Sequence, residues 1–381
     1  MRILHVIESL GRAGAEQALL NLLPDVQKRG HVCEVAALWP PYSLATDLEA
    51  AGIKVHRLDG RVERRWNVWR SARQVASLCR RRKFDVVHAH LLFADFTVAL
   101  SKLTVRRPCR VVTFHNTDFD FLQNTSPTSR LARLTLPICL RYGFDGYAAV
   151  STPVAQHYQQ HIPNLPIQFI PNAFPASLQA RPDLHRDEVL GQFGVRNEDF
   201  ALAVVARLAP EKGHAYLFQA LQQLRDGTPS LRPKVLLLGQ GPLQPQLEGM
   251  VAQLHLNDQV VFCGVQAHAQ LLPIVQMCEA FVLPSLLEGF PLAPAEAMAM
   301  ERPVLATRAG GLGDLIEAEV SGLLVPTSDA TALADGIRRL MQDAALRKRL
   351  GRAAHERIHG LFSSVAVSAR SEEFYGGLQL R

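Results

Sequence analysis

The 381-residue sequence contains no apolar run that approaches the roughly 20 residues a membrane-spanning helix needs. Apolar stretches such as Val235–Leu238 and Ala280–Leu283 have the length of buried strands. The first residues, Met1–Ile7, also predict a strand, because the apolar run is short and no small-residue cleavage site follows it. We therefore expect neither a membrane span nor a secretory signal.

Clustered cysteines are missing as well. The sequence has six cysteines, without a CxxC pair and without a histidine–cysteine cluster at metal-ligand spacing. We expect free thiols in a reducing cytoplasm, and we expect no metal or other cofactor. Short-period repeats and low-complexity tracts are also absent from the sequence, which argues against a repeat architecture.

Charge is distributed unequally along the chain. Residues 1–172 carry 22 basic and 13 acidic side chains, whereas residues 173–381 carry 19 and 22. The first part therefore has a net charge of +9 and the second of −3, within the +6 of the whole chain. We expect the two parts to face different partners.

Short apolar runs alternate with longer segments of helical periodicity, a pattern typical of parallel sheets covered by helices. The first half predicts strands at Arg2–Ile7, His31–Leu38, Val55–Leu58, Val86–His90, Arg110–His115 and Gly146–Ser151. The second half predicts strands at Phe200–Ala206, Lys234–Gly239, Val260–Gly264, Ala280–Pro284, Val304–Thr307 and Leu323–Val325.

The series of strands restarts after a proline-containing stretch, so we predict a linker over Ile170–Gly194. A chain of this length exceeds what one core usually organises, and the restart indicates two doubly wound α/β domains. Ligands of open α/β sheets bind beyond the carboxyl ends of the strands. The residues directly after each strand are therefore the candidates for chemistry, and we expect a cleft between the two sheets.

Two glutamates, Glu288 and Glu296, are separated by seven residues across a predicted strand-to-helix junction. Both can reach one pocket, where two carboxylates can orient a sugar and a ribose through their hydroxyls without a metal. The alternative is structural, with Glu296 favouring its helix start and Glu288 a solvated turn residue. Backbone N–H groups near this helix start also need acceptors, which sugar hydroxyls supply. The candidates are those of Gly289, Phe290, Leu292 and Ala293.

Two cations, Arg207 and Lys212, follow the first predicted strand of the second half. Arg207 offers a planar fork of donors and Lys212 a mobile point charge, which together suit the paired negative groups of a diphosphate. There they would stabilise the charge that builds on a leaving nucleoside diphosphate. The alternative is that both are solvated surface charges.

Glycines follow several predicted strands. Gly14 follows the first strand and lets the backbone approach a phosphate, but the Gly-x-x-Gly spacing lacks the full dinucleotide fingerprint, which disfavours a dehydrogenase. In the second half, Gly239, Gly241 and Gly264 are expected to line a nucleotide pocket. The alternative for each is an ordinary turn glycine.

His115 ends a predicted strand, where it could hydrogen-bond a donor sugar or phosphate, with a structural role as the alternative. Asp118 and Asp120 imitate the DxD motif that carries a divalent metal in a different transferase architecture. Because they fall in the first half, away from Arg207 and Lys212, we expect no metal site there.

Taken together and in order, these segments resemble the family-four retaining glycosyltransferases of the GT-B fold across essentially the whole chain. The elements that correspond are the E-x7-E pair Glu288 and Glu296, the Arg-Leu-x-x-x-Lys-Gly element Arg207–Gly213, the Gly-x-Gly-Pro loop Gly239–Pro242, the amino-terminal turn Ala13–Glu16, the Thr-x-His strand end Thr113–His115 and the last helix around Ser364–Tyr375. Two departures are Ala13, where the turn usually has glycine, and Ala173-Phe174 at the hinge, where the family often has Gly-Val.

The resemblance implies two Rossmann-like domains that face a central cleft. It implies an acceptor-side domain over 1–172, a nucleotide-sugar-binding domain over 173–363, and a final helix over 364–381 that crosses back to the first domain. It also implies a metal-independent, retaining transfer from a nucleotide diphosphate sugar, by default a UDP-sugar. The acceptor would be a glycan or lipid-linked molecule in cell-surface polysaccharide or glycolipid synthesis.

For the site, the resemblance places Glu288 near the transferred sugar, Glu296 on the ribose, and Arg207 with Lys212 on the diphosphate. The sequence offers no obvious nucleophile, which favours a front-face mechanism over paired-carboxylate glycosidase chemistry. Two alternatives remain: a nucleotide-sugar epimerase of the same fold, and a non-catalytic nucleotide-sugar-binding protein.

A basic stretch with two tryptophans lies in the first half and comprises Arg61, Arg64, Arg65, Trp66, Trp69, Arg70, Arg73 and Arg80–Lys83. Anionic lipid headgroups attract such a stretch, so we expect a cytoplasmic protein with peripheral contact at the inner membrane face. The alternative is a solvated helix whose tryptophans pack inward. No recognised nucleic-acid module surrounds the stretch, and nucleic-acid binding is not expected.

Overall fold

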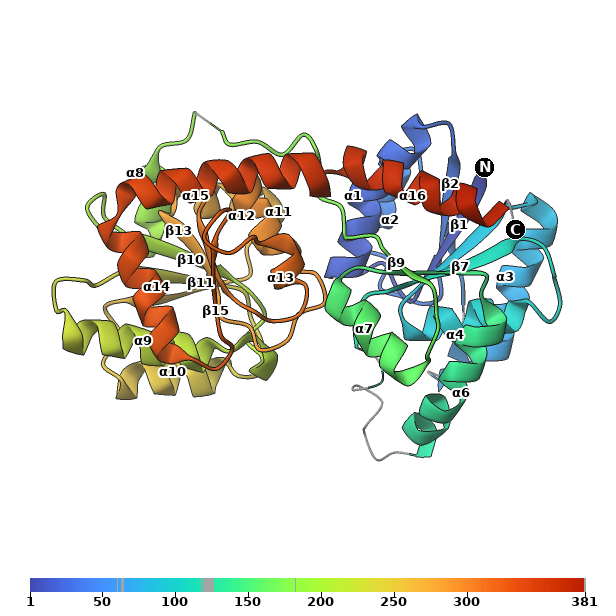
Figure 1. Cartoon of the computed structure of the whole chain (residues 1–381), viewed down its shortest axis with the longest axis horizontal. Helices are drawn as coiled ribbons and strands as arrows, with labels where there is room; N and C mark the ends of the chain where they lie inside the picture. Colours follow the sequence, from blue (N-terminus) through green and yellow to red (C-terminus); the bar gives the residue numbers. More distant parts are fainter. Residues whose placement is uncertain (60, 63–64, 118, 120–126, 182, 380–381) are drawn as a thin grey trace. The chain divides into compact units, whose positions relative to one another are not determined.

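The computed structural model describes the chain except for residues 60, 63–64, 118, 120–126, 182 and 380–381 (Figure 1). Contacts divide the chain into two compact units. Unit 1 contains Met1–Ala176 and Phe362–Arg381, and unit 2 contains Ser177–Leu361. No helix in the described ranges combines the length and apolar character needed to cross a bilayer.

Unit 1 is built on a parallel sheet of seven strands in the order β3-β2-β1-β6-β7-β8-β9. The strands are β1 (Arg2–Ile7), β2 (Val32–Ala37), β3 (Lys54–Arg57), β6 (Val86–His90), β7 (Cys109–Phe114), β8 (Gly146–Ala149) and β9 (Ile167–Phe169). A separate antiparallel pair is formed by β4 (Arg61–Val62) and β5 (Arg65–Trp66).

Helices cover both faces of this sheet. Alternate residues of β1 belong to opposite cores: Leu4 and Val6 pack on one face, whereas Ile3 and Ile7 pack on the other. The first face is covered by α3 (Val68–Arg82), α4 (Leu92–Ser101), α6 (Pro127–Gly143) and α7 (Thr152–His161). The second face is covered by α1 (Gly14–Lys28), α2 (Ala45–Ala50) and α16 (Ser364–Gln379).

The last helix, α16, belongs to unit 1 although it follows unit 2 in the chain. Val367, Phe374 and Tyr375 are buried in the same core as α1. At the surface, Arg29, directly after α1, forms an ion pair with Glu372 of α16, with 2.6 Å between Nε and Oε2. Both ends of the chain therefore contribute to one core.

Unit 2 repeats the architecture with a parallel sheet of six strands in the order β12-β11-β10-β13-β14-β15. The strands are β10 (Ala201–Val205), β11 (Lys234–Leu238), β12 (Val260–Gly264), β13 (Ala280–Leu283), β14 (Val304–Thr307) and β15 (Leu323–Val325). The helices are α8 (Arg186–Leu190), α9 (His214–Gly227), α10 (Gln244–Gln253), α11 (His268–Met277), α12 (Leu292–Ala299), α13 (Leu312–Leu315), α14 (Ala330–Gln342) and α15 (Ala344–Arg357). Short 3-10 helices lie at η1 (Gly191–Phe193) and η2 (Pro210–Lys212). A π-helix, η3 (Ile358–Phe362), leads back to unit 1.

The predicted fold class, with two doubly wound α/β units, is confirmed. The two units divide between Ala176 and Ser177, within the linker predicted over Ile170–Gly194. The second half of that range contains α8 and η1, which were not predicted, and Leu190 of α8 is fully buried despite the prolines that precede it.

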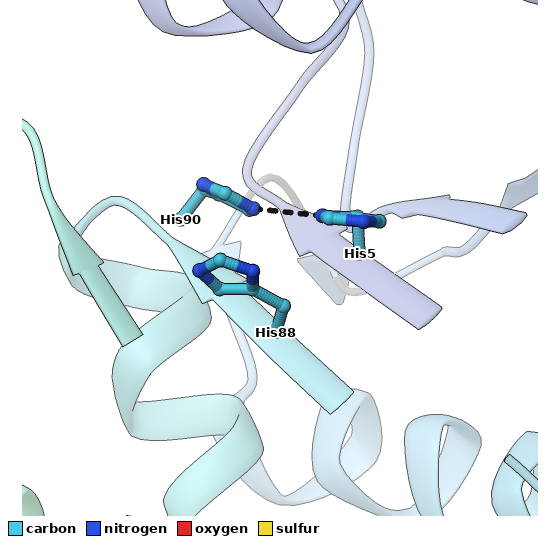
Figure 2. A group of neighbouring side chains, drawn as sticks. All are labelled: His5, His88 and His90. Atoms are coloured by element: carbon cyan, nitrogen blue, oxygen red, sulfur yellow. Dashed lines mark hydrogen bonds between the residues drawn. The ribbon is translucent and has the colours of Figure 1, made fainter. Parts of the chain in front are cut away.

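A cluster of buried histidines lies in the sheet of unit 1 (Figure 2). His5 is opposite His88 in the pairing of β1 with β6, and His90 follows two residues later on the same face. His5 Nδ1 is 3.0 Å from His90 Nε2. His88 bonds at 2.8 Å to the hydroxyl of Tyr375 and at 2.6 Å to that of Thr113. The cluster therefore ties α16 to the centre of the sheet.

Burial keeps these histidines neutral in the folded chain. Desolvation lowers the pKa of His5 to about 3 and that of His115, directly after β7, to about 4. It also lowers the pKa of His88 and His90 well below 6.5. The unfolded chain binds more protons than the folded chain once the pH falls below 6.5. The stability of unit 1 is therefore full above that pH and is lost as the pH falls toward the lowered pKa values.

We predict that the free energy of unfolding of unit 1 drops by up to about 1.4 kcal/mol per pH unit for each such histidine below the unfolded pKa. All three tryptophans lie in unit 1, so their fluorescence during urea denaturation measures this unit. His115→Asn should make the pH dependence shallower, whereas His161→Asn, at an exposed position, is the control. A free energy of unfolding that stays constant between pH 6.5 and about 5, where carboxylates remain ionised, would contradict this account.

Candidate functional site

The strand order of unit 2 reverses between β10 and β13, which are neighbours in the sheet. At such a switch point the loops after the two strands separate to opposite sides and leave a crevice at the carboxyl edge. The loop after β10 contains Arg207 and Lys212, and the loop after β13 contains Glu288. Both segments that the sequence selects for chemistry thus start at the switch point.

Lys212 and Glu288 join these two loops. Lys212 Nζ lies 2.7 Å from Glu288 Oε1, and Ser285 donates its hydroxyl hydrogen to the same oxygen at 2.6 Å. The side chains are 18% and 8% exposed, respectively, so water screens the pair weakly. Among the described residues none donates to Oε2 of Glu288, and this oxygen can accept a hydrogen bond from a ligand hydroxyl.

Close backbone packing fixes the two loops. Gly213 has a φ of +64°, and a Cβ at this position would lie 2.1 Å from the carbonyl oxygen of Pro284. The N–H of Leu286 donates to the carbonyl of Glu211 at 2.8 Å. Gly310, after β14, approaches so closely that its Cβ would lie 1.7 Å from the carbonyl oxygen of Glu288. Glu288 is therefore held between backbone segments that tolerate no side chain at these two glycines.

Arg207 occupies a different environment from Lys212. Its side chain is 71% exposed and pairs with Glu211, four residues further along the chain. The backbone carbonyl of Arg207 is 3.0 Å from Nε2 of His214, which starts α9. The guanidinium is thus oriented but accessible, and a ligand can contact it without unfolding any buried structure.

The predicted glycine loops pack beside Arg207. Cβ atoms at Gly239 and Gly241 would lie 2.1 and 2.3 Å from the carbonyl oxygens of Ala206 and Leu208. The N–H of Gly239 donates at 2.8 Å to the carbonyl of Gly264, which has a φ of +65°. The loops after β10, β11 and β12 therefore form one continuous edge that carries all three predicted glycines.

Glu296 lies in α12 and is buried, with an exposure of 8%. Its Oε1 is 2.9 Å from Nε2 of His268, at the start of α11. The N-cap residue of α12 is Pro291, whose side chain accepts no hydrogen bond from the amide groups of the first turn, which begins at Leu292. Gly289 is partly exposed just before this helix, whereas Phe290 is buried and its side chain fills the core.

The remaining predicted residues lie in unit 1. Gly14 begins α1 at an exposed position where a Cβ would meet nothing within 4 Å, so internal packing does not require a glycine there. His115 is buried, and its Nε2 lies 3.1 Å from Nδ1 of His90. Asp118 and Asp120 lie outside the described residues.

Among the residues that the structure describes, the histidine cluster is the one group whose side chains are close enough together to bind a metal ion. One nitrogen from each of His5, His88 and His90 lies within 4.8 Å of the others. The contacts of these rings with one another, with Tyr375 and with Thr113 already explain their positions. Nε2 of His5 is buried without a hydrogen-bond partner among the described residues, so hydrogen bonding accounts for only part of the cluster. The expectation that no metal binds here stays a prediction.

Three residues of the site edge escape sequence reasoning. Ser285 and Gly310 contact Glu288, and His268 contacts Glu296. Each follows a strand, which was the available signal: Ser285 after β13, Gly310 after β14 and His268 after β12. Many residues follow a strand, so the rule that ligands bind beyond strand ends does not by itself identify these three. Their contacts with Glu288 and Glu296 identify them.

Two family models match the chain. The model described as Glycosyltransferase Family 4 matches residues 12–178, and the model described as Glycosyl transferases group 1 matches residues 185–357. The chain is 25% identical over 307 residues to N-acetyl-alpha-D-glucosaminyl L-malate synthase of Bacillus anthracis, covering 80% of this chain and 77% of that protein. It is 31% identical over 238 residues to alpha-D-kanosaminyltransferase of Streptomyces kanamyceticus, covering 60% of this chain and 61% of that protein.

Solved structures show the same fold. HepE of Anabaena, crystallised with UDP, superposes with a TM-score of 0.82 over 99% of this chain and 100% of that chain, at 22% identity. The same protein has also been crystallised with UDP-glucose. With both halves matched by family models, the chain belongs to the family-four glycosyltransferases and has the GT-B fold.

Proposed function

We propose that the chain is a retaining, metal-independent glycosyltransferase that uses a nucleotide diphosphate sugar, with UDP as the nucleotide. The observation that carries this proposal is the contact of Lys212 with Glu288 at the switch point of unit 2. A cation for a diphosphate and a carboxylate for sugar hydroxyls are adjacent there, with the accessible Arg207 on the same loop as Lys212. The UDP and UDP-glucose complexes of the similar Anabaena protein support the choice of nucleotide.

In the proposed mechanism, Arg207 and Lys212 stabilise the negative charge that grows on the departing diphosphate. The bond between the anomeric carbon and the β-phosphate oxygen breaks while the acceptor oxygen bonds to the same face of that carbon. The acceptor proton passes to a phosphate oxygen of the leaving group, so the step needs no protein nucleophile. Glu288 orients the sugar through its hydroxyls, and Glu296 accepts hydrogen bonds from the ribose.

The two units divide these tasks in our proposal. Unit 2, corresponding to the expected domain 173–363, binds the nucleotide sugar through the loops with Gly239, Gly241 and Gly264. Unit 1, with the expected domain 1–172 and the final helix, binds the acceptor and contributes Gly14 and His115. The acceptor is a glycan or lipid-linked molecule of cell-surface polysaccharide or glycolipid synthesis. The positive charge of residues 1–172 supports peripheral contact with an anionic inner membrane face.

The nucleotide site predicts a thermal shift. We expect the chain to bind UDP more tightly than GDP or ADP. UDP should therefore raise the melting temperature most, because a ligand that binds only the folded chain stabilises it in proportion to its affinity. Arg207→Ala should abolish most of the shift, and this exposed residue can be removed without disturbing the core. Arg352→Ala is the matched control, since Arg352 is also exposed and also pairs with a glutamate four residues on. An undiminished shift in Arg207→Ala would place the diphosphate elsewhere.

The ribose contact predicts a specific pattern of affinities. Glu296→Gln should weaken UDP binding by about tenfold or more, because hydrogen bonds to a charged group contribute about 1.5–3 kcal/mol. The same substitution should not affect binding of 2′,3′-dideoxy-UDP, which lacks the hydroxyls that Glu296 would hold. Calorimetric titration of both ligands into both proteins measures this coupling. Equal losses for the two nucleotides would exclude the ribose as the partner of Glu296.

Transferase and epimerase activities differ when no acceptor is present. We expect UDP-N-acetylglucosamine and other UDP-sugars to remain unchanged when incubated with the chain alone, because the proposed step needs an acceptor oxygen. Proton NMR over several hours follows the sugar configuration directly. Appearance of the C2 epimer would support the epimerase alternative instead. Failure to release nucleoside diphosphate with any acceptor from a panel of glycans and lipid extracts would favour the non-catalytic alternative.

A further inference from the structure

Helix α6 of unit 1 exposes a row of large apolar side chains. Leu131, Leu134, Ile138 and Tyr142 have exposures of 62%, 73%, 60% and 72%. Their spacing of three, four and four residues places them within an arc of about 80° on the helix surface, at about 100° per residue. We name these four residues the α6 stripe. In Figure 1, α6 reaches past the end of α4.

The opposite side of α6 packs against the core of unit 1. Leu136 and Leu140 are fully buried in the cluster that covers the sheet, and Ala132 and Cys139 are partly buried against it. The α6 stripe is therefore not the core-facing side of an amphipathic helix. A helix that is apolar on two sides is usually covered on both. Within the described part of unit 1, nothing covers the stripe, as its exposures show.

The charged side chains of α6 itself are all positive. Within Pro127–Gly143 the sequence has three arginines, Arg130, Arg133 and Arg141, and no acidic residue. All three are exposed, and no described carboxylate forms an ion pair with them. Arg141 donates to the backbone carbonyl of Pro163 at 3.2 Å, which directs its side chain along the surface. At about 100° per residue, the three arginines lie along one edge of the apolar row and carry positive charge that no described carboxylate pairs.

We propose that the α6 stripe is the membrane-docking surface of this protein and that it takes an anionic lipid bilayer. Apolar side chains that enter the headgroup boundary, flanked by arginines that meet lipid phosphates, are the features that hold a helix in the interface plane. A second copy of the chain fits the surface less well, because pairing two α6 helices would bring like charges together. This inference takes up the membrane contact of the proposed function and assigns it to particular residues.

The basic stretch around α3 offers less to a membrane. Trp69 is exposed at 56%, so this tryptophan does not pack inward. Arg70 pairs with Asp59 at 2.8 Å, and Arg82 pairs with the buried Glu34 at 2.5 Å. Part of the positive charge of α3 is therefore neutralised within unit 1, whereas that of α6 is not.

The test is binding of the full chain to vesicles of equal parts phosphatidylglycerol and phosphatidylcholine, measured by flotation without nucleotide. The double variant Leu134→Ser with Ile138→Ser should bind at least about tenfold more weakly than the unmodified chain, because two exposed apolar anchors are lost. Arg130→Gln with Arg133→Gln should weaken binding to these vesicles and flatten its salt dependence. Trp69→Ala should have a smaller effect than the α6 double variant.

The matched control is Val320→Ser with Val365→Ser, which removes two exposed apolar side chains from other surfaces and should leave binding unchanged. Sedimentation velocity without lipid tests whether the α6 stripe binds a second copy of the chain instead. A dimer that the α6 double variant converts to monomer would overturn the proposal. Undiminished vesicle binding of that variant would also overturn it. The UDP thermal shift of the α6 double variant should equal that of the unmodified chain. If UDP shifts neither protein while vesicle binding behaves as expected, the nucleotide proposal fails and the membrane surface stands.

Discussion

The ion pair of Lys212 with Glu288 is the contact on which the proposed site depends. It connects the loops that follow β10 and β13, which start from neighbouring strands at the one point where the sheet reverses its order. Because both side chains are largely buried, removing either partner leaves a poorly solvated charge. The pair therefore positions the loops in the free chain and holds the groups that a nucleotide sugar would need.

The surroundings of this pair show why glycine recurs along the edge of unit 2. At Gly213 and Gly310 the backbone passes so close to a carbonyl oxygen that even a methyl group would collide. Gly239 and Gly241 meet the backbone around Arg207 in the same way. These glycines bring successive strand-end loops into direct contact, so a ligand at this edge would meet backbone amides and charged side chains together. Gly14 in unit 1 differs, since space for a side chain exists there.

Much of the architecture could be predicted from the sequence because buried parallel strands read as short apolar runs. The runs at Arg2–Ile7, Val86–His90 and Val304–Thr307 coincide with β1, β6 and β14. The helix α8 was missed because nearby prolines dominated the local pattern, although Leu190 is buried. Short strand β9 was missed because two of its three residues are exposed and give no apolar run.

The site could be predicted only in part. The spacing of Glu288 and Glu296 and the order of Arg207 and Lys212 identified candidates, but not which of them touch. The partner of Glu296, His268, depends on the packing of α11 beside α12, which no local pattern encodes. The exposure of the α6 stripe could not be predicted from the sequence either. When both sides of a helix are apolar, the sequence does not show which side is covered.

A crystal structure of the chain with UDP tests the central claim most directly. The account predicts that the diphosphate lies against Arg207 and Lys212 at the carboxyl edge of β10, with the ribose at Glu296. A diphosphate bound away from both cations, with the contact between Lys212 and Glu288 unchanged and no ligand at that edge, would contradict it.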